Sequence, residues 1–223
     1  MDDDDDETNF KIVLIGETAV GKTSIISQFV DNNFQEDLQA STGGTFSSKR
    51  LILDNGKTLK FDIWDTAGQE RYRSLTKLFY TDSSAAILVY DITRKETFEE
   101  LKNYWVNQIK ESLKENIILV IAANKSDLSE KEEVDEVMAR EFARELNALF
   151  FRTSAKNSIG IDDLFFEIAK KYIGKNDISI RKEDTREEKD DNNEKQEDIF
   201  GGNDPVKLST KKTFSNNKKK KCC

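Results

Sequence analysis

This chain of 223 residues contains no histidine, and its two cysteines, Cys222 and Cys223, stand together at the end. The absence of an imidazole excludes Ser-His hydrolases and most zinc sites. The position of the cysteines excludes a disulfide inside a folded domain. Any catalysis must therefore do without an imidazole.

Long apolar runs are also missing, because no stretch of the sequence is long and apolar enough to span a bilayer. Residues 1–7 are almost entirely acidic, whereas a secretory signal begins with positive charge. The net charge of −8 argues against a dedicated surface for nucleic acids. We expect a protein that is made and kept in the cytosol and that has no nucleic-acid partner.

Proline occurs once, at Pro205, and apolar residues make up only 36% of the chain. This shortage is concentrated at the two ends, since residues 10–174 have an ordinary composition. Segments as polar as the ends cannot bury enough apolar surface to order themselves. We therefore predict a disordered acidic leader at 1–9, one folded domain at 10–174 and a disordered tail at 175–223.

Within the domain, apolar runs alternate with amphipathic stretches of helical period. Several runs are apolar at every position, which is typical of parallel strands covered on both faces. The turn signal at residues 54–56 predicts that the strands on either side of it are antiparallel. The fold class is thus α/β: an open, six-stranded, mostly parallel sheet with one antiparallel strand and helices on both faces. The predicted strands are 11–15, 46–53, 57–64, 85–90, 117–122 and 149–152, and the predicted helices are 22–30, 70–81, 98–114, 132–146 and 160–173.

The most informative motif is G-x-x-x-x-G-K-[ST] at residues 16–23, between a predicted strand and a predicted helix. The backbone N–H groups of such a loop surround a phosphate, and the amino end of the following helix faces it. Lys22 would add a point charge for the β- and γ-phosphates, and the Thr23 hydroxyl would ligate Mg²⁺. The residues predicted to bind nucleotide here are Glu17, Thr18, Ala19, Val20, Gly21, Lys22, Thr23 and Ser24.

A second motif, Asp-Thr-Ala-Gly-Gln-Glu, follows the third predicted strand at residues 65–70. Asp65 could hold a water in the Mg²⁺ shell, and Gly68 would let its N–H group approach the γ-phosphate. Gln69 has both a donor and an acceptor, so it could orient an attacking water. We therefore predict that Lys22 and Gln69 are the catalytic residues of a nucleotide hydrolase.

Two further motifs predict the base that the site selects. In Asn124-Lys125-Ser126-Asp127 the Asp127 carboxylate could accept hydrogen bonds from the ring N–H and exocyclic amine of guanine. Adenine lacks that pair of donors. In the second motif, Thr153-Ser154-Ala155-Lys156, backbone N–H groups could meet the guanine carbonyl. The predicted base contacts are Asn124, Lys125, Asp127, Ser154, Ala155 and Lys156.

These motifs together resemble those of the Ras-type small GTPases, and most closely those of the Rab family, over residues 10–174. The loop variant at 16–23 resembles that of endosomal Rabs. The resemblance implies a small-GTPase G domain that is monomeric, binds GTP and GDP with Mg²⁺, and packs Phe34 edge-on to the guanine. It also implies a switch in vesicle transport that hydrolyses GTP slowly. The implied partners are an exchange factor, a GTPase-activating protein, effectors and prenyl-chaperone proteins.

The first switch segment departs from the Rab pattern, since residues 41–46 read Ser-Thr-Gly-Gly-Thr-Phe. One placement puts Ser41 at the position of the family's Mg²⁺-binding threonine, and the other puts Thr42 there. Either hydroxyl could ligate the ion. The two glycines would make this loop more flexible than usual.

The chain ends in Lys218-Lys219-Lys220-Lys221-Cys222-Cys223. A pair of terminal cysteines is similar to the Rab ending that carries two geranylgeranyl groups, and two lipids anchor a protein far better than one. The lysines would add attraction to anionic lipid. We expect a protein on the cytoplasmic face of an intracellular membrane, endosomal or otherwise vesicular, that cycles with the cytosol.

Two other functions fit part of the sequence. The glycine pair of the first switch segment would suit a module that holds nucleotide without hydrolysing it. A P-loop ATPase or kinase fits the loop at 16–23 but not the guanine motif at 124–127.

Overall fold

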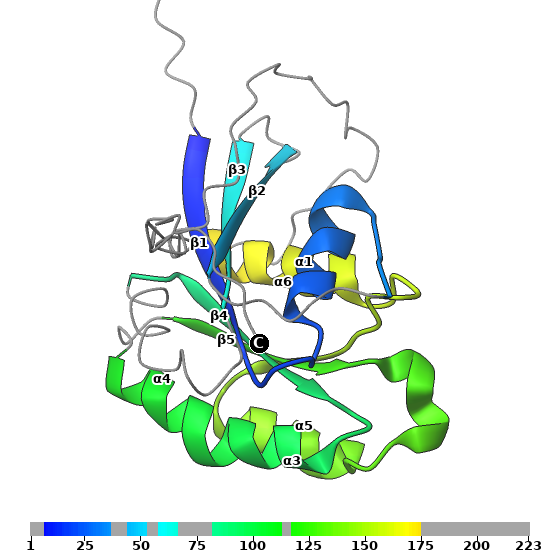
Figure 1. The fold of residues 1–223 in the computed structure, drawn as a ribbon. Helices are drawn as coiled ribbons and strands as arrows, with labels where there is room; N and C mark the ends of the chain where they lie inside the picture. The colour runs from blue at the N-terminus through cyan, green and yellow to red at the C-terminus, as the bar shows by residue number, and fades with distance from the viewer. Residues whose placement is uncertain (1–6, 37–43, 53–57, 67–81, 113–116, 175–223) are drawn as a thin grey trace, which may run out of the picture.

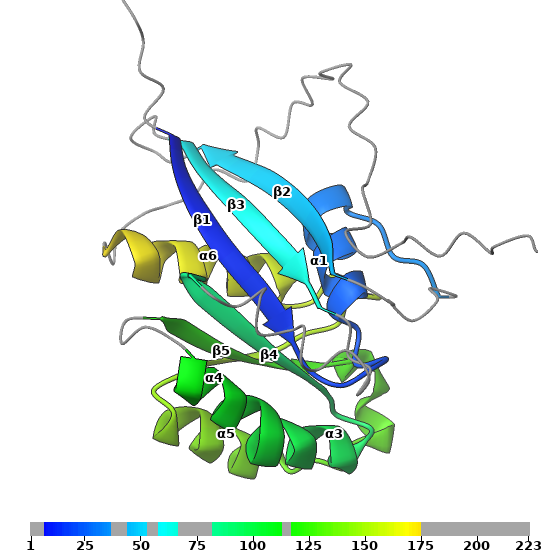
Figure 2. The same ribbon diagram turned by 60° about the vertical axis from the view of Figure 1, so that its left-hand side comes forward.

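The structure is a computed structural model that describes residues 7–36, 44–52, 58–66, 82–112 and 117–174. These residues form a six-stranded sheet in the order β2-β3-β1-β4-β5-β6. Only β2 and β3 are antiparallel, and the other neighbours are parallel. Figure 2 shows the opposite directions of β2 and β3. The predicted fold class is confirmed. The strands are β1 Glu7–Ile15, β2 Thr45–Ile52, β3 Thr58–Asp65, β4 Ala85–Asp91, β5 Ile118–Asn124 and β6 Leu149–Arg152.

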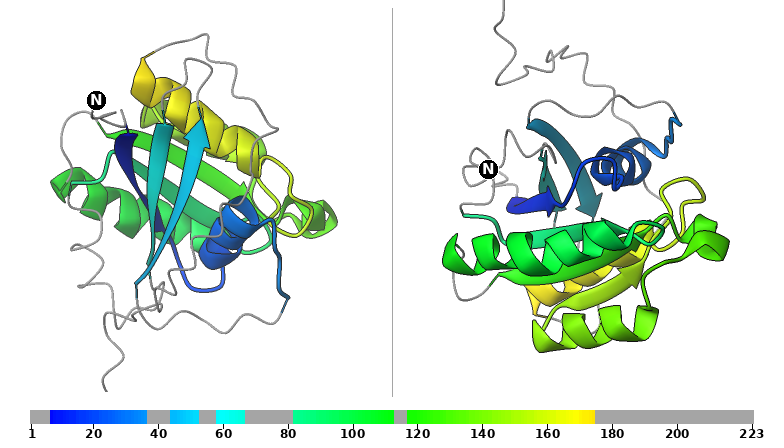
Figure 3. Two further views of the ribbon diagram at one scale, coloured as in Figure 1. Left: turned by 90° about the horizontal axis from the view of Figure 1, so that it is seen from above. Right: turned by 60° about the horizontal axis from the view of Figure 1, so that its bottom comes forward.

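Helices cover both faces of the sheet (Figures 1 and 3). On one face α1 and α6 enclose a core that includes Phe29 and Phe165, whose rings stack 3.7 Å apart. On the other face, the segment α3-η2-α4 and helix α5 enclose a core around Trp105 and Phe98. The helices are α1 Lys22–Asp31, α3 Lys95–Glu100, α4 Val106–Ser112, α5 Glu136–Glu145 and α6 Ile161–Ile173, with a π-helix η2 at Leu101–Trp105 and a 3₁₀ helix η3 at Ser126–Lys131.

Four predicted boundaries were wrong by two residues or more. β5 ends at Asn124 and not at residue 122. β1 begins at Glu7, because the backbone of residues 7–9 pairs with that of β3 from Thr58 onward, so the assignment of these polar residues to the leader is corrected. The helix predicted at 98–114 begins at Lys95 and contains the π-helix. The helix predicted from residue 132 begins at Glu136, because the Asp135 side chain caps its first turn. Residues 1–6, the helix predicted at 70–81 and the tail from 175 lie outside the described residues.

No helix among the described residues has the length and apolar character needed to cross a membrane. The central strands instead bury both of their faces under helices, and every residue of β4 is buried. The carboxylate of β4 and the carboxamide of β5, Asp91 and Asn124, stand at the carboxyl ends of these strands. There the loops after β1, β5 and β6 meet.

Candidate functional site

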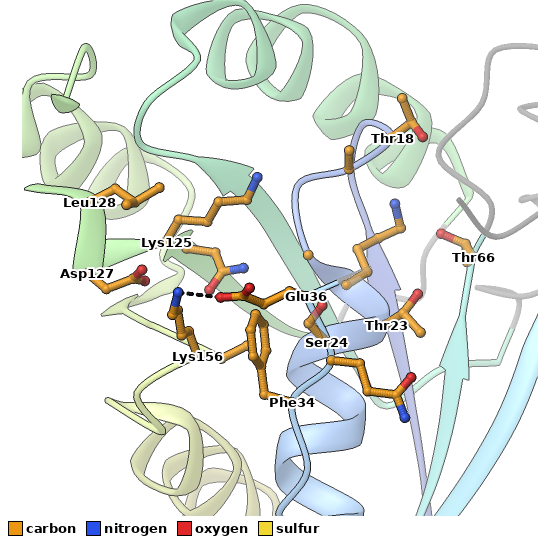
Figure 4. Close-up of a pocket in the computed structure, with 16 residues that line it drawn as sticks. Thr18, Thr23, Ser24, Phe34, Glu36, Thr66, Lys125, Asp127, Leu128 and Lys156 are labelled. Atoms are coloured by element: carbon orange, nitrogen blue, oxygen red, sulfur yellow. Dashed lines mark hydrogen bonds and ion pairs between the residues drawn. The ribbon is translucent and has the colours of Figure 1, made fainter. Parts of the chain in front are cut away.

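A pocket of about 390 Å³ opens where the loops after β1, β3, β5 and β6 meet the segment after α1 (Figure 4). Ligand pockets in open α/β sheets lie beyond the carboxyl ends of the strands. The volume is in the range that holds a small organic molecule. The lining residues are Thr18, Ala19, Gly21, Lys22, Thr23, Ser24, Phe34, Gln35, Glu36, Thr66, Asn124, Lys125, Asp127, Leu128, Ala155 and Lys156.

The loop between β1 and α1 needs its two outer glycines for close packing. A Cβ on Gly16 would lie 2.2 Å from the Val89 carbonyl oxygen, and one on Gly21 would lie 2.3 Å from Asn124 Nδ2. Gly21 also has a φ of 98°, which side chains disfavour. The loop is therefore pressed against the ends of β4 and β5 and directs the amino end of α1 at the pocket.

Lys22 is the first residue of α1, and its side chain is held inside the loop. It is only 6% exposed, and its Nζ donates to the carbonyl oxygens of Gly16 at 3.0 Å and Glu17 at 2.9 Å. Burial lowers the pKa of Lys22, although Asp65 and Glu17 act in the opposite direction. A buried cation at the rim of a helix amino end is suited to binding an anion.

Two oxygen donors lie together beside this lysine. Thr23 Oγ1 donates to Asp65 Oδ2 at 2.5 Å, and Asp65 is buried at the end of β3. The next residue, Thr66, is held in place because its hydroxyl donates to the Leu14 carbonyl at 2.7 Å. A hydroxyl and a carboxylate are ligands that suit Mg²⁺, so the residues present fit this ion.

The loop after β5 is tied to the two loops beside it. Asn124 Nδ2 donates to the Val20 carbonyl at 2.8 Å, and Asn124 Oδ1 accepts from Thr153 Oγ1 at 3.1 Å. Asp127 Oδ1 accepts from Ser154 Oγ at 2.6 Å. The three motifs that the sequence placed at strand ends therefore form one hydrogen-bonded unit.

The segment after α1 forms the wall of the pocket that the strand-end loops do not supply. Phe34 lines it, and Glu36 Oε1 forms an ion pair with Lys156 Nζ at 2.5 Å (Figure 4). This contact raises the pKa of Lys156 and lowers the pKa of Glu36. The pair joins two segments that lie on either side of the opening.

The chain matches the family model described as "Ras family" over residues 11–174. It is 45% identical over 161 residues to the human protein named "Ras-related protein Rab-22A", covering 72% of this chain and 82% of the relative. The mouse protein of the same name matches with the same identity and coverage. The chain belongs to the Ras family. Within it, the relatives show a Rab-type small GTPase, which binds GTP, hydrolyses it and serves vesicle transport.

The predicted site residues of this Rab-type chain fall into three groups. Most line the pocket. The side chains of Glu17, Val20, Asp65 and Ser154 are not among the lining residues. Glu17 Oε1 accepts from Trp105 Nε1 at 3.1 Å, and Val20 lies in the core. Asp65 accepts from Thr23 Oγ1, and Ser154 Oγ donates to Asp127. The third group, Ser41, Thr42, Gly68, Gln69, Cys222 and Cys223, lies outside the described residues.

In this small GTPase, the sequence prediction missed four residues that line the pocket, namely Gln35, Glu36, Thr66 and Leu128. It also missed two polar residues next to the pocket. Asp91 ends β4 and is buried, and Arg94 follows it in the same loop. Both lie at the edge of the sheet where the other motifs gather. A carboxylate directly after a fully apolar strand was the signal that could have identified Asp91.

Proposed function

We propose that this Rab-type GTPase is a membrane-anchored GTP/GDP switch that recruits effectors when GTP is bound and hydrolyses GTP slowly by itself. The pocket where four loops and the segment after α1 meet carries the proposal. Lys22 and the N–H groups of residues 17–24 would bind the phosphates. Asp127, Lys125 and the backbone near Ala155 would bind the guanine, and Phe34 would pack against it.

The family implies Mg²⁺, which would neutralise phosphate charge when bound. Thr23 would hold it directly and Asp65 through a water, and Ser41 or Thr42 would complete the set. The γ-phosphate would draw the N–H group of Gly68 towards it, so that loss of this phosphate releases both switch segments. Gln69 would position the attacking water, and its carboxamide is too weak a base to remove a proton by itself.

The rate of hydrolysis tests the switch. No arginine occurs in residues 16–24 or 34–46, so we expect intrinsic turnover on the order of 10⁻⁴ to 10⁻² s⁻¹ and acceleration by an activating protein. Single-turnover release of phosphate from preloaded GTP measures this directly. A Gln69→Leu variant should retain GTP under the same activator. Wild-type hydrolysis by that variant would contradict the role of Gln69.

We also propose that Cys222 and Cys223 carry two prenyl groups that anchor the protein to an endosomal or other vesicular membrane. Flotation of the prenylated protein with vesicles containing anionic lipid would test this, with a Cys222→Ser/Cys223→Ser variant as the control. Binding of the doubly substituted protein as strong as that of the wild type would contradict the anchor.

A further inference from the structure

Asp91, at the end of β4, is a buried carboxylate with four donors around it. Its Oδ1 accepts from Thr93 N at 2.9 Å and Thr93 Oγ1 at 2.7 Å. Its Oδ2 lies 2.6 Å from Lys125 Nζ and 3.3 Å from Arg94 Nε. Burial by itself would raise the pKa of Asp91, but the hydrogen bonds from Lys125 and Thr93 outweigh it and lower the pKa. The group is thus a fixed negative charge between two cations.

The two cations connect Asp91 to two different loops of the pocket. Lys125 is part of one loop, and Arg94 contacts the other. Lys125 is part of the loop that carries Asp127, and its backbone is in the left-handed region with a φ of 65°. Arg94 donates from Nη2 to the Thr18 carbonyl of the phosphate loop at 2.9 Å. One carboxylate therefore connects the phosphate loop to the guanine loop, and neither Asp91 nor Arg94 lines the pocket.

We propose that Arg94 is a positioning residue: its guanidinium, braced by Asp91, holds the phosphate loop by the Thr18 carbonyl and so slows nucleotide release. The inference rests on the proposed function of the pocket as a GDP and GTP site. Arginine suits this role because its planar fork donates in two directions at once, whereas an ammonium is a single point charge.

The backbone of Arg94 is held independently of its side chain. The Arg94 carbonyl accepts from Thr97 N at 3.0 Å and from Thr97 Oγ1 at 2.7 Å. A substitution at this position therefore leaves the start of α3 in place and removes only the contacts of the guanidinium. The effect on the phosphate loop can be measured in a folded protein.

The test measures release of fluorescent GDP into excess GDP from the full chain. We expect Arg94→Ala to release it about five- to tenfold faster, the cost of one hydrogen bond of this kind. Arg94→Lys should fall between Arg94→Ala and the wild type. The matched control is Lys95→Ala, which removes the exposed cation next to Arg94. The contact of Lys95 with Glu133 is made by its backbone N–H, which alanine retains.

A comparison of GDP with GMP distinguishes an effect on the phosphate loop from a loss of affinity across the whole pocket. GMP lacks the β-phosphate that the phosphate loop would hold. We expect the affinity for GDP to fall in Arg94→Ala while that for GMP stays within twofold. Equal losses for both nucleotides, or release of GDP at the wild-type rate, would overturn the inference. Wild-type protein that fails to bind GDP would overturn the proposed function, and this inference with it.

Discussion

Asp127 illustrates how single residues of the site are positioned before any ligand arrives. Its Oδ1 accepts a hydrogen bond from Ser154 Oγ at 2.6 Å, and Asp127 lines the pocket. An asparagine could keep the bond to Ser154 and would present its NH₂ group in place of the second carboxylate oxygen. In the proposed function, Asp127 would therefore control which pattern of donors and acceptors the pocket recognises.

We predict that Asp127→Asn changes the preferred base from guanine to xanthine. Two hydrogen bonds from guanine to a charged group would be lost, so the affinity for GDP should fall about 100-fold. Xanthosine diphosphate has a carbonyl where guanine has its exocyclic amine, and this carbonyl can accept from the new NH₂ group. Its affinity for the variant should therefore rise. Competition against fluorescent GDP and its xanthine analogue measures both.

The control for this substitution is Glu130→Gln, which neutralises an exposed carboxylate on the same 3₁₀ helix η3. It should leave both affinities unchanged. Unchanged discrimination in Asp127→Asn would show that this carboxylate does not select the base.

At the scale of elements, the π-helix η2 is an irregularity inside the helical segment at 95–112. A π-turn holds one more residue than an α-helical turn. Trp105 and Val106 are both buried where the π-helix passes into α4. Trp105 Nε1 donates to Glu17 Oε1 in the phosphate loop at 3.1 Å.

We predict that deletion of Asn103, an exposed residue inside η2, is tolerated. The π-turn would close to a regular α-turn, and the core residues on both sides would keep their directions. The free energy of unfolding in urea should change by less than about 1.5 kcal/mol. Deletion of Glu141, equally exposed but in the regular helix α5, should cost several times more, because the rest of that helix would rotate by about 100°. Equal losses from the two deletions would contradict this account.

Helix α5 is joined to β6 by an ion-pair network that depends on pH. Glu136 accepts from Arg140 Nε at 2.6 Å and from Arg152 Nη1 at 2.7 Å. The contacts with Arg140 and Arg152 outweigh burial and lower the pKa of Glu136. A carboxyl with a lowered pKa stabilises the fold above its ordinary pKa, and this contribution is lost as the pH falls through the folded-state value.

We therefore predict that Glu136→Gln destabilises the domain by up to about 1 kcal/mol at pH 7, since the group is partly exposed. The difference from the wild type should be smaller at pH 3, which is below the ordinary pKa of glutamate. Urea unfolding at the two pH values measures it, with Glu141→Gln on the same helix as the charge-matched control. A loss that is the same at both pH values would assign the effect to packing.

At the scale of the whole molecule, the pocket joins loops from both halves of the sheet. In the proposed function, the loops after β1 and β3 would bind the phosphates and Mg²⁺, and the loops after β5 and β6 would bind the base. A ligand that spans the pocket contacts loops from both halves of the sheet, so it binds the folded protein and not the unfolded chain. Its binding energy therefore adds to the stability of the entire domain.

We predict that GDP with Mg²⁺, at about 1,000 times its Kd, stabilises the protein by about 4 kcal/mol. For a domain of this size that corresponds to a rise in Tm of about 8–16 °C. A thermal melt with ATP at the same concentration is the control and should show little change. Removal of Mg²⁺ with a chelator should reduce the shift given by GDP. Equal shifts with ATP and GDP would contradict selection of guanine.

The sequence by itself determined the fold class, the approximate positions of the strands and most of the residues that line the pocket. Apolar runs of strand length, helical periods and the loop at 16–23 are local signals, because each depends on neighbouring residues alone. The start of β1 at Glu7 was missed for the same reason: its polar residues are ordered by pairing with β3, which is distant in the chain.

Only the tertiary structure decided how the loops hold one another. The position of Lys22 under its own loop carbonyls, the bond from Ser154 to Asp127 and the contacts of Asp91 all join residues whose side chains meet at one edge of the sheet. No local pattern encodes such contacts, since they depend on strand order and register. For the same reason, nothing in the sequence indicated that Arg94 donates a hydrogen bond to the Thr18 carbonyl of the phosphate loop.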